Sequence, residues 1–183
     1  MSDKEKSLDE LSKDLDVRRA KALGMGGPEK LEKRKKRGVM NARERMDYLL
    51  DDGSFIETGL LGQSSVYAAD KERTPADGKI CGFGKIEGRD ISVSVNDFTV
   101  KGSSTSATNS KKVGHIRKYG SDRGMPVVFV GESTGARLPD AMGSKGMGAL
   151  LGNDITQFQR MRDTPWCAAA LGFSFGSSCN FSR

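Results

Sequence analysis

Histidine and cysteine are scarce in this 183-residue chain, and their scarcity excludes several kinds of chemistry. The single histidine, His115, leaves little room for histidine-dependent acid–base catalysis and removes most arrangements that hold a metal ion. The three cysteines make an odd count without a Cys-x-x-Cys pair, which argues against a disulfide framework. If the chain is part of an enzyme, its chemistry therefore depends on backbone groups or on a bound cofactor.

Long apolar runs are also missing from the sequence. No run approaches the roughly 18 residues needed to span a bilayer, and the first ten residues, MSDKEKSLDE, lack the apolar stretch of a signal peptide. This pattern predicts no membrane span and a cytoplasmic location, with the mitochondrial matrix as the alternative. Hydrophobic residues make up 36% of the chain and charged residues 30%, which predicts a folded domain with a sizeable core.

Charge dominates the first fifty residues, which hold fourteen Lys/Arg and ten Asp/Glu. Apolar residues at near-helical spacing predict a helix over 8–23, and a second helix is predicted over 42–50. Between them, residues 30–37 (KLEKRKKR) carry six bases and one acid. This run could be a phosphate-binding or localisation patch, but a solvated helical face is favoured, because no aromatic residues for base stacking are interleaved. We therefore expect a charged helical extension over 1–40.

Beyond residue 55, strand and helix patterns alternate. Residues 55–67 are expected to be extended and 68–78 to form a polar loop. The predicted strands are 80–87 and 91–98, joined as a hairpin through Gly88-Arg89-Asp90, then 126–130 and 166–171, and the predicted helices are 105–119 and 150–162. The last two strands are apolar enough to be buried in a sheet. Strands that alternate with helices predict an α/β fold with parallel strands.

A G-x-S-x-G motif follows the strand predicted at 126–130, at residues 131–135 (GESTG). In α/β-hydrolases this motif presents a nucleophilic serine, here Ser133. The context argues against that role, because Pro139 and Gly143 stand where the next helix should run and because the only histidine precedes the serine. A serine hydrolase is therefore a minor alternative.

Small residues follow the last predicted strand, at 172–178 (GFSFGSS). Such residues let backbone N–H groups approach a ligand closely, and two amides that converge on a carbonyl oxygen form an oxyanion hole. A tight turn between a strand and a helix explains the same composition equally well. The residues by themselves leave both interpretations open.

Three further stretches occur in a fixed order along the chain. They are NARERM (41–46) with LLDDGSFIE (49–57), ADG (76–78) with GFGKIEGR (82–89) and NDFTV (96–100), and STGARL (133–138). Together they resemble the carboxyltransferase family of biotin-dependent acyl-CoA carboxylases, over roughly residues 30–183. The resemblance implies an α/β chain with a crotonase-like spiral of ββα units, here incomplete, after an N-terminal helical extension. Residues 41–183 would be the N-terminal part of the acyl-CoA carboxyltransferase domain.

The resemblance also implies a reaction and its residues. Carboxybiotin releases CO2, its ureido nitrogen takes the α-proton of an acyl-CoA, and the enolate attacks CO2 while backbone amides hold its oxygen. The implied amide donors are Gly176 and Ser177, and the implied CoA-channel residues are Ser133, Thr134, Gly135, Ala136 and Arg137. Serines at 177 and 178 and the threonine at 134 depart from the family pattern. They leave open which acyl group fits and whether any of these positions needs a strained positive φ.

The same resemblance implies partners and a larger protein. It implies biotin carried on a separate domain or subunit, acyl-CoA as substrate, no metal, a biotin carboxylase or biotin carboxyl carrier component, and a homo-hexamer. The net charge of +6 fits the anionic CoA as well as it fits nucleic acid, and the resemblance implies no nucleic-acid partner. Because family members run to several hundred residues, we expect residues 1–183 to be a fragment that shows no carboxyl transfer by itself. Decarboxylation is equally implied, and a non-catalytic CoA-binding or scaffold relative is the alternative.

Overall fold

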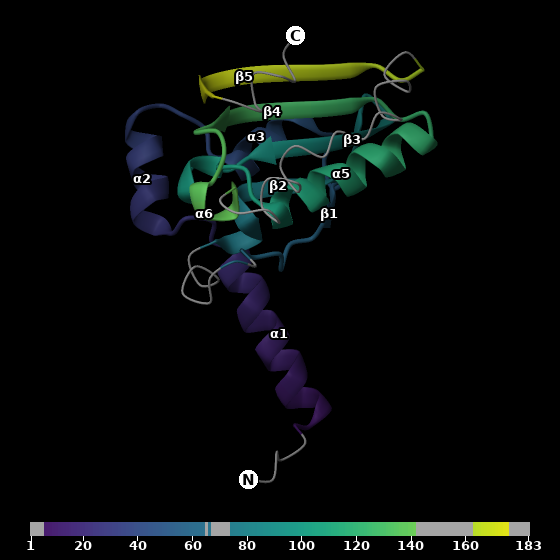
Figure 1. Ribbon diagram of the computed structural model, residues 1–183. Coiled ribbons are helices and arrows are strands. Elements are labelled where there is room, and N and C mark those ends of the chain that lie inside the picture. The colour runs from purple at the N-terminus through teal and green to yellow at the C-terminus, as the bar shows by residue number, and fades with distance from the viewer. Residues whose placement is uncertain (1–5, 65, 67–73, 142–162, 176–183) are drawn as a thin grey trace.

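The computed structural model describes residues 6–64, 66, 74–141 and 163–175, and its centre is a five-stranded sheet in the order β1-β2-β3-β4-β5 (Figure 1). The strands are β1 (Ile56–Thr58), β2 (Lys79–Ile86), β3 (Arg89–Asn96), β4 (Val127–Ser133) and β5 (Trp166–Ser174). The first three pair antiparallel, whereas β3, β4 and β5 pair parallel. The sheet therefore confirms the predicted hairpin and the predicted parallel strands.

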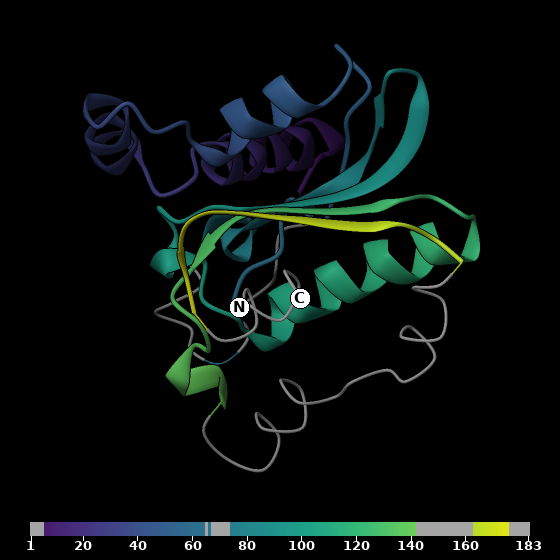
Figure 2. The same ribbon diagram turned by 90° about the horizontal axis from the view of Figure 1, so that it is seen from above.

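Helices lie on both faces of this sheet. They are α1 (Leu8–Leu23), α2 (Pro28–Lys36), α3 (Ala42–Leu49), α5 (Ala107–Asp122) and α6 (Leu138–Ala141), with two short 3-10 turns, η1 (Pro75–Gly78) and η2 (Lys101–Ser103). The N-terminal helices α1 and α3 are on one side of the sheet and α5 is on the other (Figure 2). No helix within the described ranges is both long and apolar enough to cross a bilayer.

Capping boxes explain where three of the helices begin. Ser7, Asn41 and Ser106 each accept a hydrogen bond from the backbone N–H three residues later, and the side chain of that later residue bonds back. This reciprocal arrangement satisfies two of the unpaired donors at a helix N-terminus. The predicted helices over 8–23, 42–50 and 105–119 are thus confirmed. The third, α5, begins at Ala107, directly after its N-cap Ser106.

The main apolar core lies between α3 and the hairpin. Met46 and Leu50 pack against alternate residues of β2 and β3, namely Ile80, Ile91, Val93 and Val95. On the other face, α5 approaches the sheet closely at Gly120, where an added Cβ would lie 1.9 Å from Ser92 Oγ. The sheet therefore has one apolar face under α3 and a more polar face under α5.

The hairpin turn and the last strand differ from the predictions. The turn is the two residues Glu87 and Gly88, both with positive φ (50° and 76°), rather than the three predicted, because a type I′ turn matches the twist of the strands. The segment 166–171 was expected to be buried, yet most of β5 is exposed, since it is the edge strand of the sheet. Within the described part of the segment 55–67, only Ile56–Thr58 forms a strand, and the predicted helix 150–162 lies outside the described residues.

The basic run on α2 is mostly a solvated helical face, as predicted, and Arg34 is its one partly buried base. Arg34 pairs with the buried Glu132 of β4, and Arg45 of α3 bonds the same carboxylate at 2.9 Å. Lys30 Nζ donates to the carbonyl of Thr99 at 3.0 Å. Arg34 and Arg45 thus attach the N-terminal helices to β4, and Lys30 remains exposed like the other lysines of the run.

Candidate functional site

The candidate site lies where the parallel strands β3, β4 and β5 end. In open α/β sheets, ligands bind at the carboxyl edge of the strands. Two of these ends are joined directly, because the N–H of Phe175 donates to the carbonyl of Ser133 at 3.0 Å. An added Cβ on Gly135 would lie 3.7 Å from Phe175 Cβ. The predicted CoA-channel loop thus adjoins the start of the predicted oxyanion loop, whereas Gly176 and Ser177 themselves lie outside the described residues.

Ser133 is a buried anchor of this loop. Its hydroxyl donates to the carbonyl of Ser103 at 3.1 Å and accepts from the N–H of Gly135 at 3.2 Å. His115, on α5, lies beside Tyr119, with 6.2 Å between the ring centroids. The serine hydroxyl is therefore engaged with the backbone and is not presented to solvent, so the hydrolase alternative gains no support.

The rest of the loop is clamped by the segment that follows β3. The N–H of Thr134 donates to Gly102 O at 3.0 Å, and Thr105 bonds Gly135 and Arg137 through its N–H and carbonyl at 2.7 and 2.8 Å. Side chains of Thr134 and Ala136 remain exposed. Backbone bonds thus help to hold the loop, and Thr134 and Ala136 present exposed small side chains, with the Thr134 hydroxyl donating to Gly102 O at 3.4 Å.

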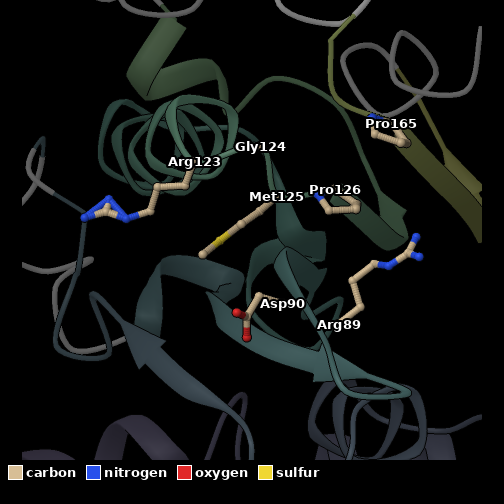
Figure 3. A pocket seen from close by; sticks show the side chains of 7 residues that line it. All are labelled: Arg89, Asp90, Arg123, Gly124, Met125, Pro126 and Pro165. Atoms are coloured by element: carbon tan, nitrogen blue, oxygen red, sulfur yellow. The ribbon is translucent and has the colours of Figure 1, made fainter.

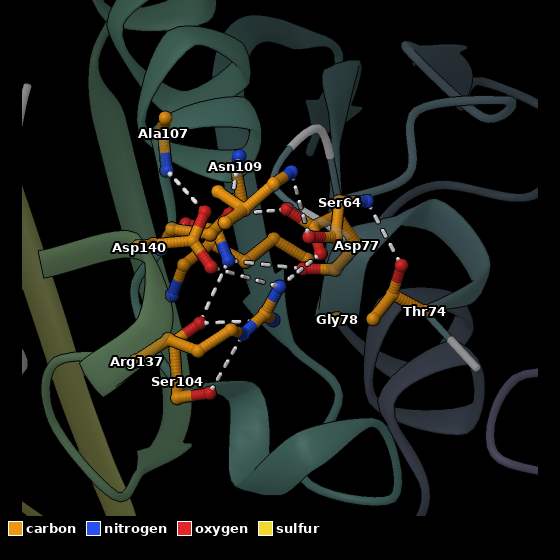
Figure 4. A network of polar contacts seen from close by, with 12 residues as sticks. Ser64, Thr74, Asp77, Gly78, Ser104, Ala107, Asn109, Arg137 and Asp140 are labelled. Carbon is orange, nitrogen blue, oxygen red and sulfur yellow. Dashed lines mark hydrogen bonds and ion pairs between the residues drawn. The ribbon is translucent and has the colours of Figure 1, made fainter. Parts of the chain in front are cut away.

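Arg137 enters a buried polar network rather than solvent (Figure 4). Its Nη1 donates to Asp77 Oδ1 at 2.6 Å, while Nε and Nη2 donate to the hydroxyl and carbonyl of Ser104 at 3.1 and 3.3 Å. Asn109 Nδ2 donates to the carbonyls of Asp77 and Ser104 at 3.0 and 2.9 Å. The role of Arg137 in the CoA channel stays a prediction. Through this network, Arg137 connects the loop 133–137 to η1 and, by way of Asn109, to α5.

Sequence reasoning missed the partners of Arg137. Asp77 was part of a quoted motif without a role of its own, and Ser104 and Asn109 were not singled out. The sequence signal for this site was the Ala-Asp-Gly run at 76–78. In the structure, Ala76 and Asp77 both adopt positive φ (48° and 47°). Such values are uncommon outside glycine and mark a backbone held in place by its surroundings.

Two buried lysines lie under this network on the α5 side. Lys112 Nζ donates to the carbonyls of Ala76 and Lys79 at 2.7 and 2.6 Å, and Lys79 Nζ donates to Asn96 Oδ1 at 2.9 Å. Burial lowers the pKa of Lys79 to about 8 and also lowers the pKa of Lys112. Burial raises the pKa of the neighbouring Cys81 thiol. In each case burial destabilises the charged form, because charge is poorly solvated there.

Phenylalanines supply an apolar surface at the same carboxyl edge. The rings of Phe98 and Phe173 stack at a centroid distance of 6.3 Å, and those of Phe173 and Phe175 at 6.4 Å. Arg34 lies over the Phe98 ring at 5.9 Å. Phe173 and Phe175 are largely exposed, although large aromatic side chains are usually buried. This aromatic row is available to an apolar ligand group.

A cavity of about 380 Å³ at the opposite edge of the sheet is a weaker candidate (Figure 3). It is lined by Arg89, Asp90, Arg123, Gly124, Met125, Pro126 and Pro165. Asp90 is paired with Lys85 at 2.5 Å, and the Arg123 guanidinium lies 3.9 Å from the centroid of the Tyr119 ring. This cavity lies at the amino ends of β4 and β5, away from the edge where α/β sheets bind ligands.

Comparison with known proteins identifies the family of the chain. The model of the carboxyl transferase domain family matches residues 33–176. The propionyl-CoA carboxylase beta chain of Cereibacter sphaeroides is 35% identical over 139 residues, which are 75% of this chain and 27% of that protein. The methylmalonyl-CoA decarboxylase subunit alpha of Veillonella parvula is 33% identical over 125 residues, 67% of this chain and 25% of that protein. The chain thus spans about a quarter of the length of these curated relatives.

A solved structure extends the likeness to the fold. Transcarboxylase 12S, determined with methylmalonyl-coenzyme A and methylmalonic acid bound and described as a hexamer assembly, superposes with a TM-score of 0.78 at 28% identity. The match covers 97% of this chain and 34% of that chain. The mixed sheet with its N-terminal helices therefore has the crotonase-like fold of the carboxyltransferases.

Proposed function

Because this chain belongs to the carboxyl transferase domain family, we propose that it forms the acyl-CoA side of a biotin-dependent carboxyltransferase. The proposed reaction moves CO2 between carboxybiotin and the α-carbon of an acyl-CoA. Biotin reaches the site on a separate component, and it supplies the CO2 and the base that takes the α-proton. The chain itself binds and orients the thioester.

The hydrogen bond from Phe175 to Ser133 is the observation that carries this proposal. It holds the end of β5 against the loop 133–137, so that the residues after Phe175 begin at the carboxyl edge of the parallel strands. Backbone amides of Gly176 and Ser177 would there stabilise the enolate oxygen, which needs preorganised donors and no side-chain base. A reaction that needs no side-chain base fits a chain whose one histidine lies on α5.

The surrounding residues fit an acyl-CoA in the same place. The aromatic row offers apolar surface to the acyl chain or the pantetheine arm. The buried bonds of Arg137 and Ser133 keep the loop in one conformation, which lowers the entropic cost of orienting the substrate. We also propose a homo-oligomer and a biotin-bearing partner, by analogy with the hexamer of transcarboxylase 12S.

A chimera tests the proposal directly. Residues 33–178 would replace the matching segment of the Cereibacter sphaeroides propionyl-CoA carboxylase beta chain, and carboxylation of propionyl-CoA would be measured with the biotin-bearing partner. We expect turnover, and we expect Gly176→Pro, which removes one N–H, to reduce kcat by about 100-fold or more while acyl-CoA binding is retained. Gly176→Ala keeps the N–H and is the matched control.

Two outcomes would contradict the proposal. A folded chimera that binds acyl-CoA without turnover would indicate a CoA-binding scaffold. Full activity in the Gly176→Pro variant would show that this amide is not an oxyanion donor. Circular dichroism and size-exclusion chromatography of each variant separate these outcomes from misfolding.

A further inference from the structure

A buried ion cluster, named here for Glu132, Arg34 and Arg45, lies directly beside the loop 133–137. Glu132 is the residue before Ser133 on β4, and its Oε1 accepts a hydrogen bond from Arg34 of α2. Arg45 of α3 meets the same oxygen at 2.9 Å through Nη2. The side chains of Glu132 and Arg45 are each 7% exposed, and that of Arg34 is 14% exposed. One carboxylate therefore joins α2 and α3 to the strand that leads into the candidate site.

The ion cluster lies opposite a break in the register of β4 and β5. Two pairings flank this break, Gly131 with Ala170 and Ser133 with Ser174. Between them β4 has one residue, Glu132, whereas β5 has the three residues 171–173, named here the β5 bulge. Bulges change the direction of a strand and are common beside active sites. The course of β5 into the candidate site is therefore set at the position that faces Glu132.

A glycine at the centre of the β5 bulge lets the carboxylate approach the strand. An added Cβ on Gly172 would lie 2.6 Å from Glu132 Oε2 and 3.1 Å from its Cδ. Because Arg34 and Arg45 both hold Oε1, the carboxylate cannot turn away from β5 without breaking two buried ion pairs. The β5 bulge is therefore shaped around the ion cluster.

Arg34 reaches the β5 bulge by a second route. Its guanidinium lies 5.9 Å from the centroid of the Phe98 ring. That ring stacks on Phe173, a residue of the bulge, with 6.3 Å between the centroids. The ion cluster thus contacts the bulge directly through Glu132 and indirectly through Phe98.

From these contacts we infer that Glu132, held by its two arginines, is a positioning residue for the proposed reaction. It fixes the β5 bulge and thereby aims the backbone amides that follow Phe175. Amide donors need a preorganised geometry, because displacing a reacting group by about 1 Å can lower a rate by about 100-fold. Glu132 acts through the backbone of β5 and not on the reacting atoms. This inference rests on the proposed function.

Turnover of the chimera that contains residues 33–178 tests the inference. Glu132→Gln and Gly172→Ala should each lower kcat by about 10- to 100-fold, because both changes shift the end of β5. The KM for propionyl-CoA should change by less than about threefold, since the loss falls on contacts made in the transition state. Circular dichroism establishes that each variant is folded.

Arg43→Met is the matched control. It breaks the pair between Arg43 of α3 and Glu57 of β1, at 2.9 Å, which also joins a helix to the sheet but lies away from the β5 bulge. This variant should keep kcat within about twofold of the parent. A further comparison uses Arg34, which bonds Glu132 through Nη2. Arg34→Lys keeps a charged donor there and should recover most of the turnover lost in Arg34→Met.

Amide hydrogen exchange of the 183-residue chain gives a readout that needs no turnover. The N–H of Phe175 donates to Ser133 O at 3.0 Å just after the β5 bulge, so its protection reports how firmly the bulge is held. Arg34→Met should lower this protection about tenfold more than it lowers the protection of the β3 amides. Arg43→Met should not lower the protection of Phe175 more than that of β3.

The outcomes separate this inference from the proposed function. Parent-like kcat in Glu132→Gln and Gly172→Ala, or an equal loss of kcat in Arg43→Met, would overturn the positioning role. Protection of Phe175 that falls no further in Arg34→Met than in Arg43→Met would overturn it as well. If the folded parent chimera shows no turnover while Phe175 loses protection as expected, the ion cluster still fixes the β5 bulge and the carboxyltransferase proposal falls.

Discussion

Arg137 and Asp77 lie 60 residues apart in the sequence and form a buried ion pair, with 2.6 Å between Nη1 and Oδ1. The pair joins the loop after β4 to the turn η1 before β2. The hydroxyl of Ser104 accepts from Arg137 Nε, and the hydroxyl of Ser106 donates to Asp77 Oδ2, so each charge has a further polar partner. The candidate site is therefore held by a polar interior rather than by apolar packing alone.

Removing the arginine of this pair should destabilise the fold strongly. Arg137→Met leaves Asp77 buried without its guanidinium, which typically costs about 3–5 kcal/mol. Arg18→Met removes the exposed pair with Asp14 on α1 and should cost less than about 1 kcal/mol. Urea unfolding of both variants measures the difference, and similar midpoints for the two would contradict the structural role given to Arg137.

Stability should rise with pH just above pH 8 because of Lys79. Burial lowers the pKa of Lys79 to about 8 from its usual 10.5, so between these values the unfolded chain binds more protons than the folded chain. The free energy of unfolding then rises by up to about 1.4 kcal/mol per pH unit. Lys112 acts in the same direction, whereas the raised pKa of Cys81 opposes it above pH 9.

A Lys79 variant separates the lysine effect from that of Cys81 between pH 8 and 9. Urea unfolding at several pH values should show a steeper rise in the parent chain than in Lys79→Met. Lys85→Met, at an exposed position of the same strand, is the control and should keep the parent slope. Equal slopes in Lys79→Met and the parent would show that Lys79 is not the titrating group.

Ser133 should not react as a nucleophile. A fluorophosphonate probe followed by peptide mass spectrometry is expected to leave it unlabelled, because its hydroxyl is buried and bonded to Ser103 O and Gly135 N–H. Ser133→Ala should instead lower the free energy of unfolding by about 1–2 kcal/mol through these lost bonds. Labelling of Ser133 in the native chain would revive the hydrolase alternative.

Two glycines of α5 should respond in opposite ways to alanine. Gly114 has no neighbouring atom within 4 Å of an added Cβ, so Gly114→Ala should stabilise the protein by about 0.5–1 kcal/mol through helix propensity. Gly120→Ala places a Cβ 1.9 Å from Ser92 Oγ and 2.9 Å from Ser92 Cβ. We expect overpacking to cost about 1–3 kcal/mol there. Thermal unfolding of the two variants would contradict this if both shifted the same way.

Local sequence patterns predicted the helices and strands well, but they did not predict contacts between residues far apart in the sequence. Helical spacing identified α1, and alternation identified the hairpin, because both depend on near neighbours. The inward orientation of Arg34 depends on Glu132, 98 residues later, and no periodicity encodes that pairing. The exposure of β5 likewise follows from its place at the sheet edge and not from its apolar composition.

The candidate site was predictable only as a set of motifs. The loop 133–137 was identified from its sequence, and the structure adds that Ser133 and Arg137 serve the interior while Thr134 and Ala136 face outward. Which side chains turn inward depends on the backbone groups of the segment after β3, and the motif 133–137 does not include that segment. The implied donors Gly176 and Ser177 remain predictions.

The two-residue turn between β2 and β3 also bears on the order of folding. Only two residues separate the paired strands β2 and β3, so the hairpin can form with little loss of chain entropy on loop closure. The parallel pairing of β4 with β3 closes a long crossover through α5, and contacts of that range form slowly. We therefore expect the hairpin to form first. The strands β4 and β5, whose carboxyl ends carry the candidate site, should then pair onto it last.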